Sequence, residues 1–161
     1  SLAANIGGES AISVAGRVKR TSTGTRDTII SLSVAFTATT KVFVDFQADN
    51  TLRLGGRSQS GESFQGLATT DTFTDTSAWI LFGGVIDVAN DTLKIYIDGV
   101  LNKTGSVAFG SSSFDFNFGV SHNIGASGTP AHYHAGTISA LRVYSGELTA
   151  NEFARIAEEL R

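Results

Sequence analysis

Apolar residues alternate with polar or small residues along several short runs of the chain. The first run begins at Ala11. Its apolar residues Ile12, Val14 and Val18 occupy every second position or a multiple of two, with small or charged residues between them. Side chains on a β-strand point alternately to opposite faces of the sheet, so this spacing predicts a strand with one buried face. β-Branched and aromatic residues, which strands prefer, dominate this run and two further runs with the same pattern, Ile30–Phe36 and Val42–Phe46. A turn at Ala48–Asn50 then leads into a run at Thr51–Leu54, which ends at Gly55-Gly56.

The run Trp79–Val88 is different because it is almost continuously apolar. Such a run is typical of a strand that is buried on both faces, and it predicts Trp79 as a core residue. Asn90-Asp91 then indicates a turn into a strand at Leu93–Ile97. Asp98-Gly99 predicts a tight hairpin turn, because glycine tolerates the positive φ that such turns require.

Two more strands are predicted in the last third of the chain. Phe114, Phe116 and Phe118 fall on one face of a strand and are expected to pack in the core. The last strand is expected at about His132–Tyr144. The polar stretch Arg57–Thr76 is interpreted as a loop.

A single helix is predicted at the C-terminal end. Thr149 followed three residues later by Glu152 is a capping box, in which each side chain satisfies a backbone amide of the other residue. The apolar residues after it follow the helical period and form one stripe: Phe153, Ile156, Ala157 and Leu160. This helix is expected to pack on the sheets as a closing element.

These elements predict an all-β fold, an antiparallel sandwich of two sheets with one C-terminal helix. The length of 161 residues favours one domain over 1–161, with a lead-in at 1–10 and the helix at 149–161. Hydrophobic residues make up 41% and charged residues 17%, which excludes a disordered chain. Eighteen glycines and a single proline agree with many turns.

Composition also excludes several kinds of partner and chemistry. The chain has no cysteine, so it has no disulfides, zinc-thiolate sites or thiol catalysis. A net charge of −3 argues against a nucleic-acid partner. No run approaches the length of a membrane span, so no membrane insertion is expected.

Several short motifs resemble the laminin-G-like, or concanavalin A-like, domains. The central hairpin, Trp79–Asp87 followed by Leu93–Gly99, is similar to the Trp-x-His-x-x-x-Val-x-Asp and Tyr-x-Asp/Asn-Gly pattern of that family. The end of the chain is similar too, in Gly136–Ile138, Arg142–Tyr144 and Leu148–Phe153. The resemblance implies a laminin-G-like jelly roll over the whole chain.

The chain departs from the family pattern at a few positions. Leu81 stands where the family often has His, Gly16 where it often has Trp, and Ser139-Ala140 where an acidic pair is common. These departures put in doubt any charge or hydrogen bond attached to those positions, but they leave the architecture unaffected. The family includes lectins, adhesion modules, hydrolases and virion proteins, so the fold alone does not give the function.

Catalysis is not expected. Polysaccharide hydrolases need two carboxylates flanking the scissile bond, and the glucanases of this fold carry them as Glu-x-Asp-x-x-Glu on one strand. The chain has no such motif. Asp45 and Asp49 are the nearest carboxylate pair on a strand, and Asp49 is better explained as a turn residue.

The histidines are candidate ligand-binding residues. His132 and His134 flank Tyr133, and on a strand this spacing would place both imidazoles on one face. They could chelate a transition metal with His122 as a third ligand. Alternatively, His132, Tyr133 and His134 could form a surface on which sugars stack, or they could be an exposed strand end without a ligand.

Calcium is the commoner metal in the resembled family, and the chain has two candidate rims for it. These are Asp71 with Asp75, and Asp87 with Asn90 and Asp91. Their hard oxygen ligands would suit Ca²⁺. The alternative is that these residues only form turns, where Asp and Asn are common.

The sequence therefore predicts a non-catalytic recognition module, part of a larger protein, that binds a glycan or a surface protein outside the cell or on a virion. The alternative is a structural phage or virion protein, and self-association into a homo-oligomer is a further hypothesis. Binding is expected in the loops Gly55–Thr76 and Gly119–His134, because loops on a rigid sandwich often carry function.

Overall fold

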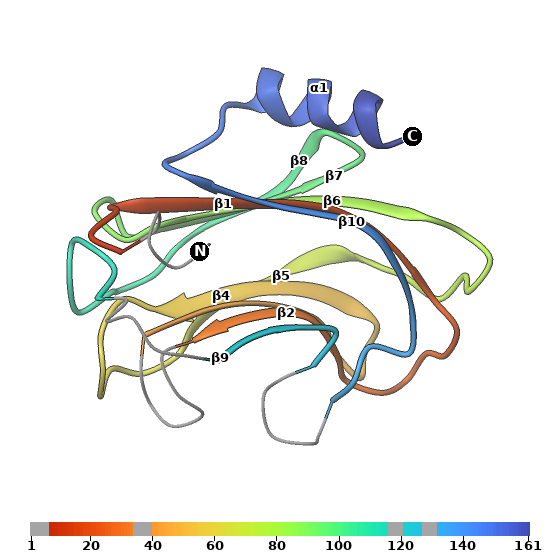
Figure 1. The fold of residues 1–161 in the computed structure, drawn as a ribbon, viewed down its shortest axis with the longest axis horizontal. Helices are drawn as coiled ribbons and strands as arrows, with labels where there is room; N and C mark the ends of the chain where they lie inside the picture. The colour runs from red at the N-terminus through yellow and green to blue at the C-terminus, as the bar shows by residue number, and fades with distance from the viewer. Residues whose placement is uncertain (1–6, 34–39, 116–120, 127–131) are drawn as a thin grey trace.

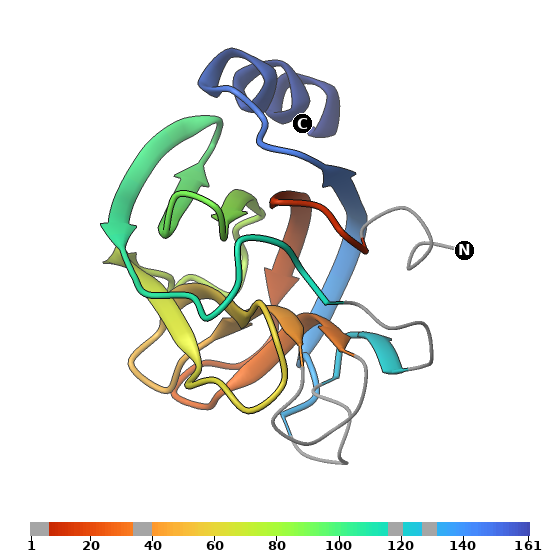
Figure 2. The same cartoon turned by 90° about the vertical axis from the view of Figure 1, so that its left-hand side faces the viewer.

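Two antiparallel five-stranded sheets face each other in the computed structural model, which describes residues 7–33, 40–115, 121–126 and 132–161 (Figures 1 and 2). Sheet A has the order β10 (Gly136–Ser145), β1 (Ala11–Arg20), β6 (Ile80–Asp87), β7 (Thr92–Ile97) and β8 (Val100–Ser106). Sheet B has the order β5 (Gln65–Thr72), β4 (Thr51–Arg57), β3 (Lys41–Phe46), β2 (Asp27–Ser33) and β9 (Ser121–Ile124). The predicted antiparallel sandwich of two sheets is confirmed.

The core lies between the two sheets and is built from the alternating residues. In β3, Val42, Val44 and Phe46 point inward and are almost completely buried. Opposite them in sheet A, Phe82 and Ile86 of β6 belong to the same cluster. Every residue of β6 is buried, because sheet B covers one face of this strand and the helix side covers the other. The doubly buried strand predicted here is confirmed.

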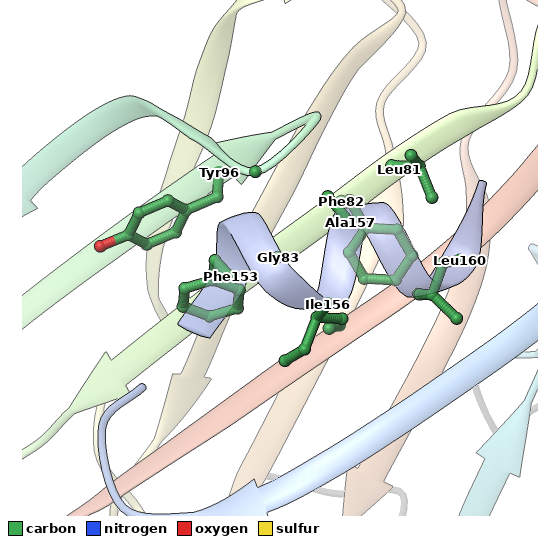
Figure 3. A pocket seen from close by; sticks show the side chains of 11 residues that line it. Leu81, Phe82, Gly83, Tyr96, Phe153, Ile156, Ala157 and Leu160 are labelled. Atoms are coloured by element: carbon green, nitrogen blue, oxygen red, sulfur yellow. The ribbon is translucent and has the colours of Figure 1, made fainter. Parts of the chain in front are cut away.

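Helix α1 (Ala150–Leu160) covers the outer face of sheet A (Figure 1). The predicted capping box is present, since Thr149 Oγ1 accepts from the Glu152 amide and the Glu152 carboxylate accepts from the Thr149 amide. Phe153 stacks on Tyr96 of β7 with 4.2 Å between ring centroids (Figure 3). The hollow under the helix has a volume of only about 10 Å³, room for one water, so this seam is packing and not a ligand site.

The tight turn predicted between β7 and β8 is also confirmed. Asp98 and Gly99 both have positive φ, 52° and 82°, as a primed hairpin turn requires. Among the described residues, no helix has the length and apolar character needed to cross a membrane.

Three expectations about the strands need correction. Arg57–Thr76 is not one loop, because it contains the edge strand β5, whose mostly polar sequence carries little hydrophobic signal. The run from Thr51 does not end at Gly55-Gly56, since β4 continues to Arg57. The last strand begins at Gly136, so His132 lies outside it.

The prediction that Trp79 is a core residue is wrong. Trp79 precedes β6 and is 36% exposed, and two cations lie over its ring. The Arg17 guanidinium lies 4.4 Å and the Lys19 amine 5.4 Å from the ring centroid. Of the predicted aromatic stripe, Phe114 is in the core, whereas Phe116 and Phe118 lie outside the described residues.

Candidate ligand-binding pocket

A positively charged pocket opens on the outer face of sheet B, the face turned away from sheet A. In Figure 1, β2 and β4 arch toward sheet A, which makes this outer face concave. The pocket has a volume of about 240 Å³. Four cationic and two aromatic side chains line it: Arg26, Lys41, Phe43, Arg53, Arg57 and Phe64.

Strand register brings most of these residues together. On β3, Lys41, Phe43 and Asp45 alternate with the inward-facing core residues and therefore share the outer face. The neighbouring strand β4 places Arg57 opposite Lys41 and Arg53 opposite Asp45. The pocket floor is therefore part of a hydrogen-bonded sheet and is held rigidly.

Phe43 forms the floor. Its side chain is only 1% exposed, because three cations lie over its ring at 4.8 to 5.7 Å from the centroid: Lys41, Arg26 and Arg53. Cations are attracted to the negative face of an aromatic ring, so each contact contributes roughly 0.5–1 kcal/mol at such partly exposed sites. The floor therefore also orients the charged groups above it.

Phe64 forms a half-buried wall. Its ring meets Phe43 edge-on, with centroids 6.3 Å apart, and Arg53 and Arg57 lie 5.0 and 5.6 Å from its centroid. This position depends on Gly55 in β4, where a Cβ atom would lie 2.6 Å from the Phe64 ring and 2.3 Å from the Gln65 carbonyl oxygen. A glycine is needed there because both contacts are closer than real Cβ atoms approach.

Among the described residues, Asp45 is the carboxylate that pairs with this group of cations. It is fully buried and accepts two hydrogen bonds from Arg53, at 3.0 and 2.9 Å. Its Oδ2 also pairs with Arg26. One carboxylate is thus shared by two arginines, which fixes both guanidinium groups along the floor.

Lys41 and Arg57 have no such counter-charge among the described residues. Arg57 donates from Nε to the Glu62 carbonyl oxygen at 2.9 Å. The Glu62 carboxylate is used elsewhere, where it accepts from Ser58 and from the Gly110 amide. Burial lowers the pKa of the Lys41 amine, and the charges of Arg57, Arg26 and Arg53 lower it further against the opposing effect of Asp45.

The structure separates the histidines that the sequence placed on one strand face. His132 is exposed, has a positive φ of 64° and precedes β10, so it does not share a strand face with His134. The His134 side chain is 3% exposed, with Nδ1 3.3 Å from Asp27 and the ring stacked on Phe46. The predicted shared face is wrong because the chain turns at His132 before β10 begins.

The other two candidates of that group are Tyr133 and His122. Tyr133 is 60% exposed, so its ring faces solvent. The backbone of His122 pairs with Leu32 in sheet B, whereas its side chain lies outside the described residues. A ligand surface at Tyr133 stays a prediction.

The two carboxylates of the first predicted calcium rim are engaged in hydrogen bonds with other side chains and with backbone. Asp71 accepts a hydrogen bond from Asn102 Nδ2 on β8. Asp75 accepts from the Ser77 hydroxyl and amide, at 2.6 and 2.8 Å. These bonds hold the pKa of the Asp75 carboxyl below its usual value. Both side chains serve local turns or cross-strand contacts.

The second rim is a turn stabilised by its own side chains. Asp87 accepts from the Asn90 amide and side chain, at 3.0 and 2.7 Å. Asp91 accepts from the Phe109 amide at 2.8 Å. In the described part of the chain no three His, Cys, Asp or Glu side chains come together as metal ligands would. Calcium binding stays a prediction that these contacts do not support.

The sequence pattern did not predict the pocket residues, because the strongest signal in these strands is their apolar face. The alternation that places Val42, Val44 and Phe46 in the core also places the residues between them on the outer face. The available signal was the spacing of Arg53 and Arg57 in the next strand, because residues four apart in a strand lie on the same face. Their meeting with Lys41 depends on the register of β3 and β4, which local sequence does not reveal.

The same jelly-roll architecture occurs in solved structures of low sequence identity. The CBM40 of the Ruminococcus gnavus IT-sialidase, bound to α2,3-sialyllactose, matches 93% of this chain and 84% of its own at 18% identity and a TM-score of 0.73. A heptameric SAP-like pentraxin from Limulus polyphemus matches 94% and 71% at 18% identity and 0.70. Domain 4 of AbnA, an arabinanase from Geobacillus stearothermophilus in complex with arabinotriose, matches 93% and 68% at 21% identity and 0.67.

The fold thus defines the class of the protein as a concanavalin A-like sandwich. The family model described as the concanavalin A-like lectin/glucanases superfamily matches residues 2–154, so the chain belongs to this family. A sequence search of curated proteins finds no match.

Proposed function

We propose that the protein is a non-catalytic carbohydrate-binding module and that it holds its glycan in the pocket on sheet B. The observation that carries this proposal is the combination of a ring, Phe64, with several fixed hydrogen-bond donors on a rigid concave sheet. Sugars present both apolar ring faces and hydroxyl groups, so ligand sites of this kind combine an aromatic surface with a few placed polar groups.

The comparisons agree with this proposal at the level of fold. Two of the structures with the same architecture contain a bound oligosaccharide, sialyllactose in one and arabinotriose in the other. Neither shares more than 21% of its residues with this chain, so the ligand of the present protein has to be argued from its own pocket.

A hydrolytic role has less support. Glycosidases use two carboxylates on either side of the scissile bond. Asp45 is the carboxylate beneath the described pocket lining, and it is buried and held by Arg26 and Arg53. An extracellular location accords with a glycan-binding role. Three further hypotheses stay predictions: a structural role in a virion, a surface-protein partner and self-association into a homo-oligomer.

The proposal is tested with a glycan array followed by isothermal titration calorimetry of a bound glycan. Phe64→Ala is expected to abolish measurable binding, whereas Tyr133→Ala, which removes the exposed ring of the other candidate surface, should leave it unchanged. The opposite result would place the site at Tyr133. Binding should survive EDTA if no calcium is involved. A silent array would contradict the proposed function and favour a structural role.

A further inference from the structure

The pocket holds an unusual pair of like charges. Lys41 and Arg57 are direct register partners on neighbouring antiparallel strands, and both line the same pocket. Like charges directly opposite on a sheet face are destabilising. The arrangement therefore weakens the free protein unless something negatively charged lies between the two side chains.

The protein itself does not provide that negative charge in its described part. Four cations line the pocket against the one carboxylate of Asp45, and Arg53 and Arg26 already share its two oxygens. Ion pairs to Lys41 or Arg57 are missing among the described residues. The chain as a whole carries −3, so the positive charge is a local property of this face.

The remaining hydrogen-bond donors of Arg57 and Lys41 are the groups that a ligand in this pocket would contact. Arg57 uses Nε for the Glu62 carbonyl oxygen, which fixes the guanidinium, and its terminal nitrogens donate no hydrogen bond within the described residues. Lys41 lies above the Phe43 ring at 4.8 Å and can offer its ammonium group from the opposite strand. A planar guanidinium next to an ammonium suits the oxygens of a carboxylate or sulfate.

We propose that the pocket is specific for an acidic saccharide, with Lys41 and Arg57 binding its carboxylate or sulfate group and Phe64 contacting the sugar ring. This inference rests on the proposed function and adds the chemical class of the ligand. The volume of about 240 Å³ is below the roughly 300–1,000 Å³ of pockets that enclose drug-sized ligands, so one acidic sugar unit is enough to fill it.

The test begins with an array that carries acidic and neutral glycans, and continues with calorimetry on matched pairs. The pairs are 3′-sialyllactose with lactose, for a carboxylate, and galactose 6-sulfate with galactose, for a sulfate. The acidic member of at least one pair should bind at least about tenfold more tightly than the neutral member, and the affinity should fall with added salt. The pair that shows the difference identifies the acidic group.

Charge-removing variants then test the two residues. Lys41→Gln and Arg57→Gln should each lower the affinity for the acidic glycan by about tenfold, and Lys41→Arg should restore most of it. Matched controls are Lys19→Gln and Arg17→Gln, which remove cations that lie over the Trp79 ring on the other sheet. The controls should leave the affinity unchanged, and thermal unfolding confirms that each variant is folded.

The possible outcomes distinguish the specificity for acidic saccharides from the proposed carbohydrate-binding function. If neutral glycans bind as tightly as acidic ones and Phe64→Ala abolishes both, the module function stands and the acidic specificity is wrong. Equal losses in the pocket variants and in the Arg17 and Lys19 controls would also overturn the inference, because the effect would then come from overall charge. Absence of binding to every glycan would overturn the proposed function itself.

Discussion

Lys41 on β3 and Arg57 on β4 lie directly across from each other on the outer face of sheet B, without a carboxylate paired to either in the described part of the chain. A sheet selected only for stability would place opposite charges or apolar side chains there. Conflicts between local chemistry and stability are expected at functional sites. This pair is therefore the feature from which the binding properties of the protein are best tested.

Stability should depend on pH through Lys41. Its pKa is lowered from 10.5 by burial and by Arg57, Arg26 and Arg53. Between the lowered pKa and 10.5 the unfolded chain binds more protons than the folded one, so this group makes the free energy of unfolding rise with pH in that window. Denaturant unfolding from about pH 8 to 11 should show the rise as a difference between the wild type and Lys41→Gln. A pH-independent difference would contradict it.

Binding of an acidic glycan should show the reverse pH dependence. The pocket needs a protonated Lys41, which faces Arg57, Arg26, Arg53 and Asp45, so affinity should fall at a lower alkaline pH than an ordinary lysine would cause. Because a bound anion stabilises the ammonium form, binding should take up protons in this range. Calorimetry in two buffers of different ionisation enthalpy measures this uptake, which Lys41→Gln should eliminate.

Asp45→Asn should destabilise the fold and disturb the pocket. The substitution leaves Arg53 and Arg26 without their counter-ion over a buried site. Breaking a buried ion pair costs about 3–5 kcal/mol, and the partial exposure of both arginines reduces the expected loss to about 2 kcal/mol. Urea unfolding measures the loss, and Asp49→Asn, at an exposed turn of the same region, is the control expected to change stability much less.

Gly55→Ala should cost stability and ligand affinity together. The new methyl group would collide with the Gln65 carbonyl oxygen and the Phe64 ring, so the wall of the pocket must move. Overpacking of this kind costs about 1–3 kcal/mol. Gly110→Ala is the control, because the three atoms nearest to its methyl group belong to the side-chain ends of Gln59 and Glu62 and not to backbone or to the Phe64 ring. An unaltered affinity in a folded Gly55→Ala protein would show that Phe64 does not shape the site.

Trp79→Ala should be mild for the loss of a tryptophan. A buried Trp replaced by Ala costs about 3–5 kcal/mol, but Trp79 is 36% exposed and its ring contacts the cations Arg17 and Lys19. We expect a loss of about 1–2 kcal/mol and unchanged glycan affinity. Chemical denaturation measures this loss in the free energy of unfolding. A loss of about 3–5 kcal/mol would contradict the prediction and would show that Trp79 is a core residue, as the apolar run Trp79–Val88 indicated.

Local sequence was enough for the elements whose signals are strong. The capping box of Thr149 and Glu152, the Asp98-Gly99 turn and the apolar strand β6 are all where their patterns predicted them. Strand β5 was missed, because an edge strand with one partly covered face needs few apolar residues. The predicted end of a strand at Gly56 and the predicted start of a strand at His132 were also wrong. Backbone pairing with the neighbouring strands sets these boundaries, so β4 continues to Arg57 and β10 begins only at Gly136.

The amino-acid sequence alone determined the class of the fold, because a two-residue period and well-marked turns are local properties of the chain. It also determined which residues of β3 face outward. Only the tertiary structure decided which other residues meet on that face. Arg26, Phe64 and the β4 arginines meet Lys41 although they are separated from it along the chain, and register is a property of two strands and not of one.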